Sequence, residues 1–165
     1  MILPDAGLMI PDIRSCRLLL VQPGASAPSA QLGTTGACHH QPPTYFGSPN
    51  GVFPLRDGPY LVTEINGDWV DAMSLNGSVA WSTHPPGVAY PSDSNEISAD
   101  RYLAVDDSTP GQIVVFNHNG TALWTYRPIG GAQLNRPSLA LPLPNGDIFA
   151  ADGASTIPSS SSPSD

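Results

Sequence analysis

Three stretches of the sequence align without gaps: PNGVFPLRDGPYLVTE (49–64), PSDSNEISADRYLAVD (91–106) and PSLALPLPNGDIFAAD (137–152). Each stretch opens with a proline and a short strand-like run. A turn follows nine residues after the proline, and a second apolar run then ends on an acid, which lies 15 residues from the proline in all three. Two such runs separated by turn residues predict a pair of antiparallel strands in each stretch.

The first two stretches are each followed by a second matching segment. The segment WVDAMSLNGSVAWST (69–83) matches QIVVFNHNGTALWTY (112–126). Both contain Asn-Gly between two apolar runs, which is a strong hairpin signal because both turn residues then take positive φ. Hairpins are therefore predicted at Asn76–Gly77 and Asn119–Gly120.

A partial copy precedes these segments. Asp12 aligns with Glu64 and Asp106, and CRLLLV (16–21) aligns with the third strand. Four short strands repeated about every 40 residues are typical of the blades of a β-propeller. An ordinary β-sandwich also has short strands, but it has no reason to repeat them at a fixed spacing. The tryptophans are interpreted as packing residues of the blades: Trp69, Trp81 and Trp124.

We therefore predict an all-β fold, a partial β-propeller with about two complete four-stranded blades and two part-blades. The predicted boundaries are a lead-in over 1–11, a part-blade over 12–33, blades over 49–83 and 91–126, a part-blade over 137–152 and a disordered Ser-rich tail over 153–165. A closed propeller needs about 4–8 blades. The chain is therefore expected to be a fragment, to pair with another chain, or to self-associate through open blade edges. The tail itself is interpreted either as a frame-shifted strand or as a natural flexible tail.

Composition excludes several classes of function. The 165 residues include 19 Pro and 16 Gly, yet 40% are hydrophobic, which argues against disorder for most of the chain. The net charge is −8, Lys is absent and the six Arg are dispersed, so nucleic acid is not an expected partner. No apolar run is long enough for a membrane span and no signal peptide is recognised, so the default expectation is a cytoplasmic protein, with export of a longer parent protein as the alternative.

The blade pattern, roughly P…G…(apolar)-D…(strand)…D/N-G…W, resembles that of the NHL/quinoprotein-like group of bacterial propellers. The resemblance covers residues 12–152 and includes the segments YFGSPNGVFPL, YPSDSNEI and LNRPSLALPLPNGDI. It implies a propeller fold. Propellers of this broad group include lyases, sulfotransferases and quinone-dependent dehydrogenases, so the resemblance also leaves an enzymatic role open.

The repeated acids are the first candidates for a site. Glu64, Asp106 and Asp152 each end the second strand of a blade, where oxygen ligands from neighbouring loops would suit a divalent cation such as Ca²⁺. The alternative is that each acid accepts backbone N–H hydrogen bonds from its own turn, since a residue repeated in every blade usually serves the repeat.

Residues that break the repeat are the second candidates. His39 and His40 follow Cys38 in the long connection before the first full blade, and His84 lies in the next connection. These connections are expected to share one face of the propeller, with the Asn-Gly hairpins on the other. Cys38, His39 and His40 offer thiol and imidazole donors for Zn²⁺ or Cu, but zinc-type Cys/His spacing is absent, so solvated histidines are the alternative.

Two further pairs complete the candidates. Asp93 and Asn95 are polar where the matching segment is apolar, so they are expected to face a ligand or water in the central channel. Cys16 and Cys38 form either a disulfide or two buried thiols, because spacing alone does not decide. The predicted function is non-enzymatic binding of a small molecule or a protein. The alternative is a propeller enzyme in which His39, His40 or His84 acts as a base beside a cation.

Overall fold

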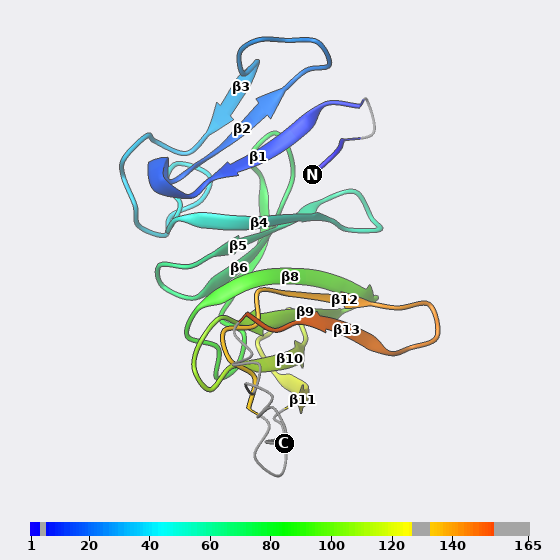
Figure 1. Cartoon of the computed structure of the whole chain (residues 1–165). Helices are drawn as coiled ribbons and strands as arrows, with labels where there is room; N and C mark the ends of the chain where they lie inside the picture. Colours follow the sequence, from blue (N-terminus) through cyan, green and yellow to red (C-terminus); the bar gives the residue numbers. More distant parts are fainter. Residues whose placement is uncertain (4–5, 127–132, 154–165) are drawn as a thin grey trace, which may run out of the picture.

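The computed structural model describes residues 1–3, 6–126 and 133–153, and it is built from four antiparallel sheets (Figure 1). Sheet I contains β1 (Leu8–Asp12), β2 (Arg17–Val21) and β3 (Ala30–Leu32). Sheet II contains β4 (Pro49–Pro54), β5 (Tyr60–Glu64), β6 (Trp69–Met73) and β7 (Val79–Thr83). Sheet III contains β8 (Pro91–Ser98), β9 (Arg101–Asp106), β10 (Gln112–Phe116) and β11 (Ala122–Tyr126). Sheet IV contains β12 (Leu139–Pro142) and β13 (Ile148–Ala151).

The sheets are arranged as successive blades. Within each sheet, consecutive strands are neighbours, and the first strands β4, β8 and β12 contact one another along the inner side (Figure 1). This combination of up-and-down sheets and adjacent first strands is the architecture of a β-propeller. The all-β prediction and the partial propeller are thus confirmed. Among the described residues, no helix has the length and apolar character needed to cross a bilayer.

The start of the first sheet differs from the predicted boundary. The lead-in was expected to reach residue 11, whereas β1 begins at Leu8 and pairs with β2 from Leu8↔Val21 to Asp12↔Arg17. Pro11 argues against a strand at this position in the sequence, because proline is excluded from central strands. The strand nevertheless forms, since β1 is at the edge of sheet I and does not need every ladder hydrogen bond. The predicted disordered tail lies outside the described residues, except for Gly153.

Alternating side chains of β5 build two apolar layers. Tyr60 and Val62 face sheet I, where they pack with Leu18 and Phe46. Leu61, between them in sequence, faces sheet III and joins the cluster formed there with Val70, Ala72, Val114 and Phe116. A third layer lies between sheets III and IV, around Leu103, Val105, Ile113, Val115 and Ala140. Each sheet is therefore packed against its neighbours in the series, with sheets II and III between two apolar layers, as repeat proteins require.

The Asn-Gly hairpins form, but not with the predicted turn. At these turns only the glycines have positive φ, 89° for Gly77 and 75° for Gly120. Each hairpin also carries a register shift in the preceding strand, at Ala72/Met73 and at Val115/Phe116. The next most common hairpin loop after the two-residue turn is a type I turn followed by a residue in the left-handed region, which forms a β-bulge. The glycine φ values and the register shifts fit this kind of loop.

As expected, each hairpin lies at the opposite end of its sheet from the repeated acid and from the exit of the last strand, since Met73 pairs with Val79 at the hairpin end of sheet II and Glu64 pairs with Trp69 at the other end. A Cβ atom on Gly77 would be 3.0 Å from Pro43, in the connection between sheets I and II. A Cβ atom on Gly120 would be 2.6 Å from Thr83 Oγ1 and 3.3 Å from His84 O. The glycine of each hairpin therefore also approaches the connection that leaves the preceding blade.

Candidate functional site

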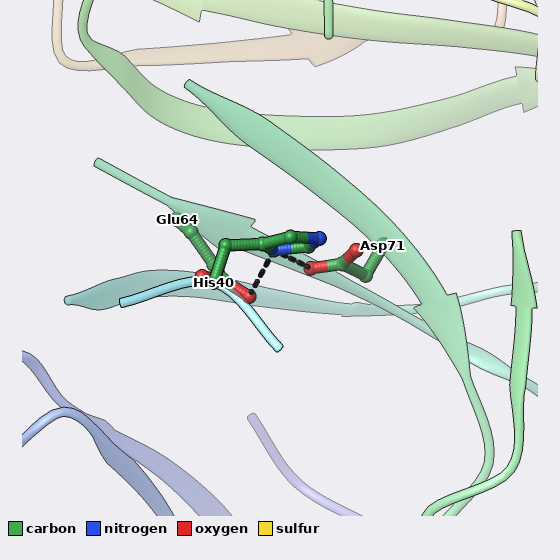
Figure 2. A group of neighbouring side chains, drawn as sticks. All are labelled: His40, Glu64 and Asp71. Atoms are coloured by element: carbon green, nitrogen blue, oxygen red, sulfur yellow. Dashed lines mark hydrogen bonds and ion pairs between the residues drawn. The ribbon is translucent and has the colours of Figure 1, made fainter. Parts of the chain in front are cut away.

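Three side chains from separate elements converge between sheets I and II. Glu64 ends β5, Asp71 is the central residue of β6, and His40 comes from the connection that precedes β4. The β5–β6 register pairs Val62 with Asp71, so Asp71 and Glu64 project from the same face of sheet II. Figure 2 shows both carboxyl groups directed at the same ring nitrogen of His40.

The three groups are close and poorly hydrated. His40 Nδ1 lies 3.3 Å from Glu64 Oε1 and 3.9 Å from Asp71 Oδ2. The side chains of Glu64 and Asp71 are 0% exposed, and that of His40 is 18% exposed. Glu64 Oε2 also accepts a hydrogen bond from the backbone N–H of Gly47, whereas the carboxyl oxygens of Asp71 face Glu64, Ser82 and His40 without a partner in full hydrogen-bond geometry.

Asp71 occupies a position that belongs to the apolar core in the next blade. The alignment of 69–83 with 112–126 places Asp71 opposite Val114, which is fully buried in the layer between sheets II and III. The same alignment places Leu19 there in sheet I. A buried carboxyl group where the repeat has valine and leucine costs stability unless it is paired, so this departure from the repeat points to a function.

Burial dominates the electrostatics of the cluster. Burial, followed by the neighbouring carboxyl group of Asp71, raises the pKa of Glu64 to about 9. Burial also raises the pKa of Asp71. Burial lowers the pKa of His40, against the opposite effect of the Asp71 charge. The imidazole is thus held towards its neutral form, in which it binds metal ions and accepts protons.

Trp69 brings the second predicted histidine to the cluster. Its ring stacks on His40 with a centroid distance of 4.0 Å, and it contacts His84 at 3.6 Å. His84 Nδ1 also lies 3.1 Å from the backbone oxygen of Asp68. The interpretation of Trp69 as a blade-packing residue is therefore wrong, because its ring contacts two histidines of the connections. Trp81, in contrast, packs against Tyr102 of the next sheet.

The third histidine of the sequence analysis is separate from the cluster. The ring of His39 contacts Tyr45 at a centroid distance of 4.2 Å, within its own connection. His39 and His40 lie in a bend, and their rings contact different partners, Tyr45 and Trp69, so they do not converge on one point. The structure thus brings His40 and His84 together with Glu64 and leaves His39 outside.

The repeated acids share one structural role. Each accepts a backbone N–H hydrogen bond from the connection that precedes the first strand of its own sheet. The three bonds are Gly47 N–H to Glu64, Tyr90 N–H to Asp106 (2.9 Å) and Asn135 N–H to Asp152 (2.7 Å). The donors belong to the connection rather than to the turn after the acid, but this bonding explains the repetition without a cation. In the described part of the chain, only Glu64 of these acids belongs to a cluster of three metal-type donors.

Asn95 links two blades instead of lining a channel. Its side chain is 2% exposed and donates hydrogen bonds to Ala140 O on β12 (2.8 Å) and to Asp93 Oδ2 (2.6 Å). Asn95 therefore satisfies the backbone of the neighbouring sheet, which is why a polar residue is tolerated on β8. Burial raises the pKa of Asp93.

Cys16 and Cys38 form a disulfide with a Cα–Cα distance of 5.2 Å. The bond joins the residue just before β2, between the first two strands of sheet I, to the connection that carries His40, two residues before that histidine. Of the two possibilities that spacing left open, the structure contains the disulfide. It restrains the backbone next to His40.

A separate cavity of about 640 Å³ lies between the loops of sheets II and III. Its lining includes Asn50 and Ile65 from sheet II and its loops, and Tyr90, Ser92 and Asp107 from sheet III and its loops. The volume is in the range of small-molecule sites, and a position between successive blades is a usual one for such sites.

Comparison with known proteins places the chain among β-propellers by shape alone. The structure is similar to virginiamycin B lyase from Staphylococcus aureus, in a catalytically inactive variant with quinupristin (TM-score 0.67, 14% identity, 92% of this chain and 47% of that chain). It is also similar to a Bacteroides caccae protein of unknown function (TM-score 0.63, 19% identity, 92% and 54%). A third match is the WD40 β-propeller domain of Doa1 (TM-score 0.56, 12% identity, 84% and 42%). The chain spans about half the length of these proteins.

No family profile and no curated protein matches the sequence. At the identities of the structural matches, the likeness establishes the propeller fold and nothing finer.

The sequence analysis missed two residues of the cluster, Asp71 and Trp69. The signal that could have found them is their departure from the repeat. Asp71 aligns with Val114, and Trp69 aligns with Gln112. Residues shared by the two segments mark the repeat, whereas a functional site is indicated where aligned residues differ in polarity.

Proposed function

We propose that this chain is part of a β-propeller of the NHL/quinoprotein-like type that binds a small molecule in the cavity between the loops of sheets II and III. The observation that carries the proposal is the cavity itself, about 640 Å³, lined by loops of two successive blades. The similarity to a propeller lyase described with quinupristin supports it, because that protein holds a small molecule on the same fold.

The chemistry of the cavity indicates the kind of ligand. Ile65, Tyr90 and Pro91 provide apolar surface, and Tyr90 is 57% exposed. The hydroxyl groups of Ser108 and Thr109 already donate to Asp106 and Asn135. Few free polar groups remain, so a largely apolar ligand is favoured.

Arg136 supplies the one cationic group of the cavity lining. Its guanidinium is paired with Asp107, with Nε 3.1 Å from Oδ1, and its side chain is 66% exposed. A ligand with a carbonyl or carboxylate end could therefore reach a positive charge at the rim, where the arginine fork favours such groups.

Fragment mapping by NMR tests this proposal. A ¹⁵N-labelled sample is titrated with a library of small aromatic acids, and shift changes are assigned to residues. Binding in the cavity is expected to perturb Ile65 and Ser92, and to weaken at least about tenfold in Tyr90→Ala, since an aromatic wall often dominates such a site. Tyr126→Ala is the matched control, because Tyr126 is exposed outside the cavity. Shift changes spread over the surface, or equal in both variants, would contradict the proposal.

A propeller enzyme of the metal-assisted lyase, sulfotransferase or quinone-dependent dehydrogenase type is the alternative function. It is favoured by the contact of Trp69 with both His40 and His84 beside two buried carboxyl groups. The lyase with the similar fold was inactivated by a histidine-to-alanine change, which supports a histidine base on such a scaffold. Turnover that disappears in His84→Ala while fragment binding persists would favour this alternative.

A further inference from the structure

We propose that His40, Glu64 and Asp71 form a binding site for a single divalent transition-metal ion, with Zn²⁺ as the best-suited ion. The site goes beyond the proposed small-molecule binding, because it uses a different set of residues between sheets I and II. The three side chains offer one imidazole nitrogen and two carboxylate oxygens, and these atoms lie within 4.8 Å of one another.

The separations of the donor atoms fit such an ion. A Zn²⁺ ion bound at about 2.0–2.2 Å from each ligand holds tetrahedral ligand atoms about 3.4 Å apart. His40 Nδ1 is 3.3 Å from Glu64 Oε1 and 3.9 Å from Asp71 Oδ2. Both carboxyl groups point at the same nitrogen (Figure 2), so small side-chain movements suffice to surround an ion.

Asp71 provides the independent argument for a ligand. Its side chain is 0% exposed, and its oxygens face Glu64, Ser82 and His40 without a partner in full hydrogen-bond geometry. Buried polar groups are nearly always satisfied, and an exception in a native fold calls for an explanation such as an ion. The repeat does not require the residue, because Val114 occupies the same position in the next blade.

The neighbours of the cluster hold its donors in place. Gly47 N–H binds Glu64 Oε2, which leaves Oε1 directed at His40. Trp69 stacks on the imidazole at an interplanar angle of 8°. The disulfide at Cys38 restrains the backbone two residues before His40. Such supporting contacts around the donors are typical of metal sites.

The donor set selects the ion. Calcium takes 6–8 oxygen ligands, and this cluster offers two carboxyl groups and a nitrogen. Imidazole favours Zn²⁺ and its neighbours in the first transition row, and three protein ligands leave a position for water or a bound molecule. The proposal therefore differs from the Ca²⁺ site suggested by the repeated acids: it places one transition-metal ion at a single blade.

Metal titration of the purified chain tests the site. The protein is stripped with EDTA and titrated with Zn²⁺ by calorimetry and with Co²⁺ by visible absorption. We expect one equivalent of each ion to bind. In His40→Ala and in Asp71→Asn the affinity for the ion should fall at least about tenfold, because even residues that only support metal ligands cost about that much when they are mutated. His118→Ala is the matched control, because His118 pairs with Asp100 as an exposed His–Asp pair outside the cluster.

A second measurement separates loss of binding from loss of folding. Zn²⁺ is expected to raise the melting temperature of the wild type and of His118→Ala, and to leave that of Asp71→Asn unchanged, while circular dichroism shows the same sheet content in all three metal-free proteins. Absence of Zn²⁺ and Co²⁺ binding to the wild type would overturn the proposal. Equal binding to wild type and to both cluster variants would also overturn it. Neither result would bear on the proposed small-molecule binding, because the cavity between sheets II and III uses different residues.

Discussion

At the scale of single residues, the molecule combines a repeat that builds the fold with a few positions that depart from it. Glu64, Asp106 and Asp152 belong to the repeat, and each closes a connection onto its sheet by accepting a backbone N–H. Asp71 departs from the repeat and has no partner in full hydrogen-bond geometry. Replacement of a repeated acid is expected to destabilise the fold. Replacement of Asp71 is expected to impair function without destabilising the fold.

Replacement of Asp71 by valine is expected to stabilise the metal-free protein. The change removes a buried carboxyl group that has no partner in full hydrogen-bond geometry and introduces the residue found at position 114. The expected gain in the free energy of unfolding is about 1–3 kcal/mol, the usual cost of an unsatisfied buried polar group. Urea unfolding in EDTA measures it. Val114→Ala, at the matching position, is the control and should destabilise by a similar amount. A loss of stability in Asp71→Val would show that the carboxyl group supports the fold.

The stability of the metal-free protein is expected to fall as the pH rises above the ordinary range of a glutamic acid. The pKa of Glu64 is raised from 4.5 to about 9 in the folded protein, so the folded state holds a proton that the unfolded chain releases. This contribution to stability is complete below about pH 4.5 and is lost progressively towards pH 9. Urea unfolding in EDTA at pH 5 and pH 8 measures the loss, and Glu64→Gln should reduce it. A pH-independent difference between wild type and Glu64→Gln would contradict this expectation.

At the scale of elements, the hairpins connect neighbouring blades. The turn at Gly77 packs against Pro43, and the turn at Gly120 packs against Thr83 and His84. Each hairpin thus braces the connection that leaves the preceding blade. Since His40 and His84 belong to these two connections, the geometry of the cluster depends on the hairpins as well as on the strands.

Gly120→Ala is expected to be more destabilising than Gly24→Ala. The two glycines have nearly the same φ, 75° and 74°, so the backbone strain of about 1–2 kcal/mol is common to both. A Cβ atom on Gly120 would lie 2.6 Å from Thr83 Oγ1, while one on Gly24 would have no neighbour within 4 Å. Crowding of a packed site adds about 1–3 kcal/mol. Chemical unfolding of both variants measures the difference, and equal losses would show that the hairpin does not press on the preceding blade.

At the scale of the whole molecule, the blades are packed in series and the last ones have an open face. Sheet II is covered on both sides, whereas Leu123, Trp124 and Tyr126 on β11, the last strand of sheet III, are 43–47% exposed. Trp81, the counterpart of Trp124, packs against Tyr102 of the following sheet. The apolar surface of β11 thus has the composition of a blade interface, and such surfaces favour association.

Self-association of the isolated chain is expected to involve β11. Leu123→Lys places a charge on an exposed apolar strand and should shift the protein towards monomer at a given concentration. Sedimentation velocity over a concentration series measures the shift. Leu75→Lys, at an exposed leucine in the hairpin of sheet II, is the matched control. A wild-type chain that stays monomeric, or equal behaviour of both variants, would contradict the expectation.

The sequence by itself determined the repeat, the antiparallel strands and hence the propeller, because the alternation of apolar residues and the spacing of turns are local properties of a chain. It also identified Glu64, His40 and His84 as candidates, each from its own segment. Local patterns do not carry the contacts between segments, however. The convergence of His40 with Asp71, the stacking on Trp69 and the pairing of Cys16 with Cys38 depend on how sheet I and its connection pack against sheet II. Only the tertiary structure decided these, since packing between blades sets distances that no spacing along the chain encodes.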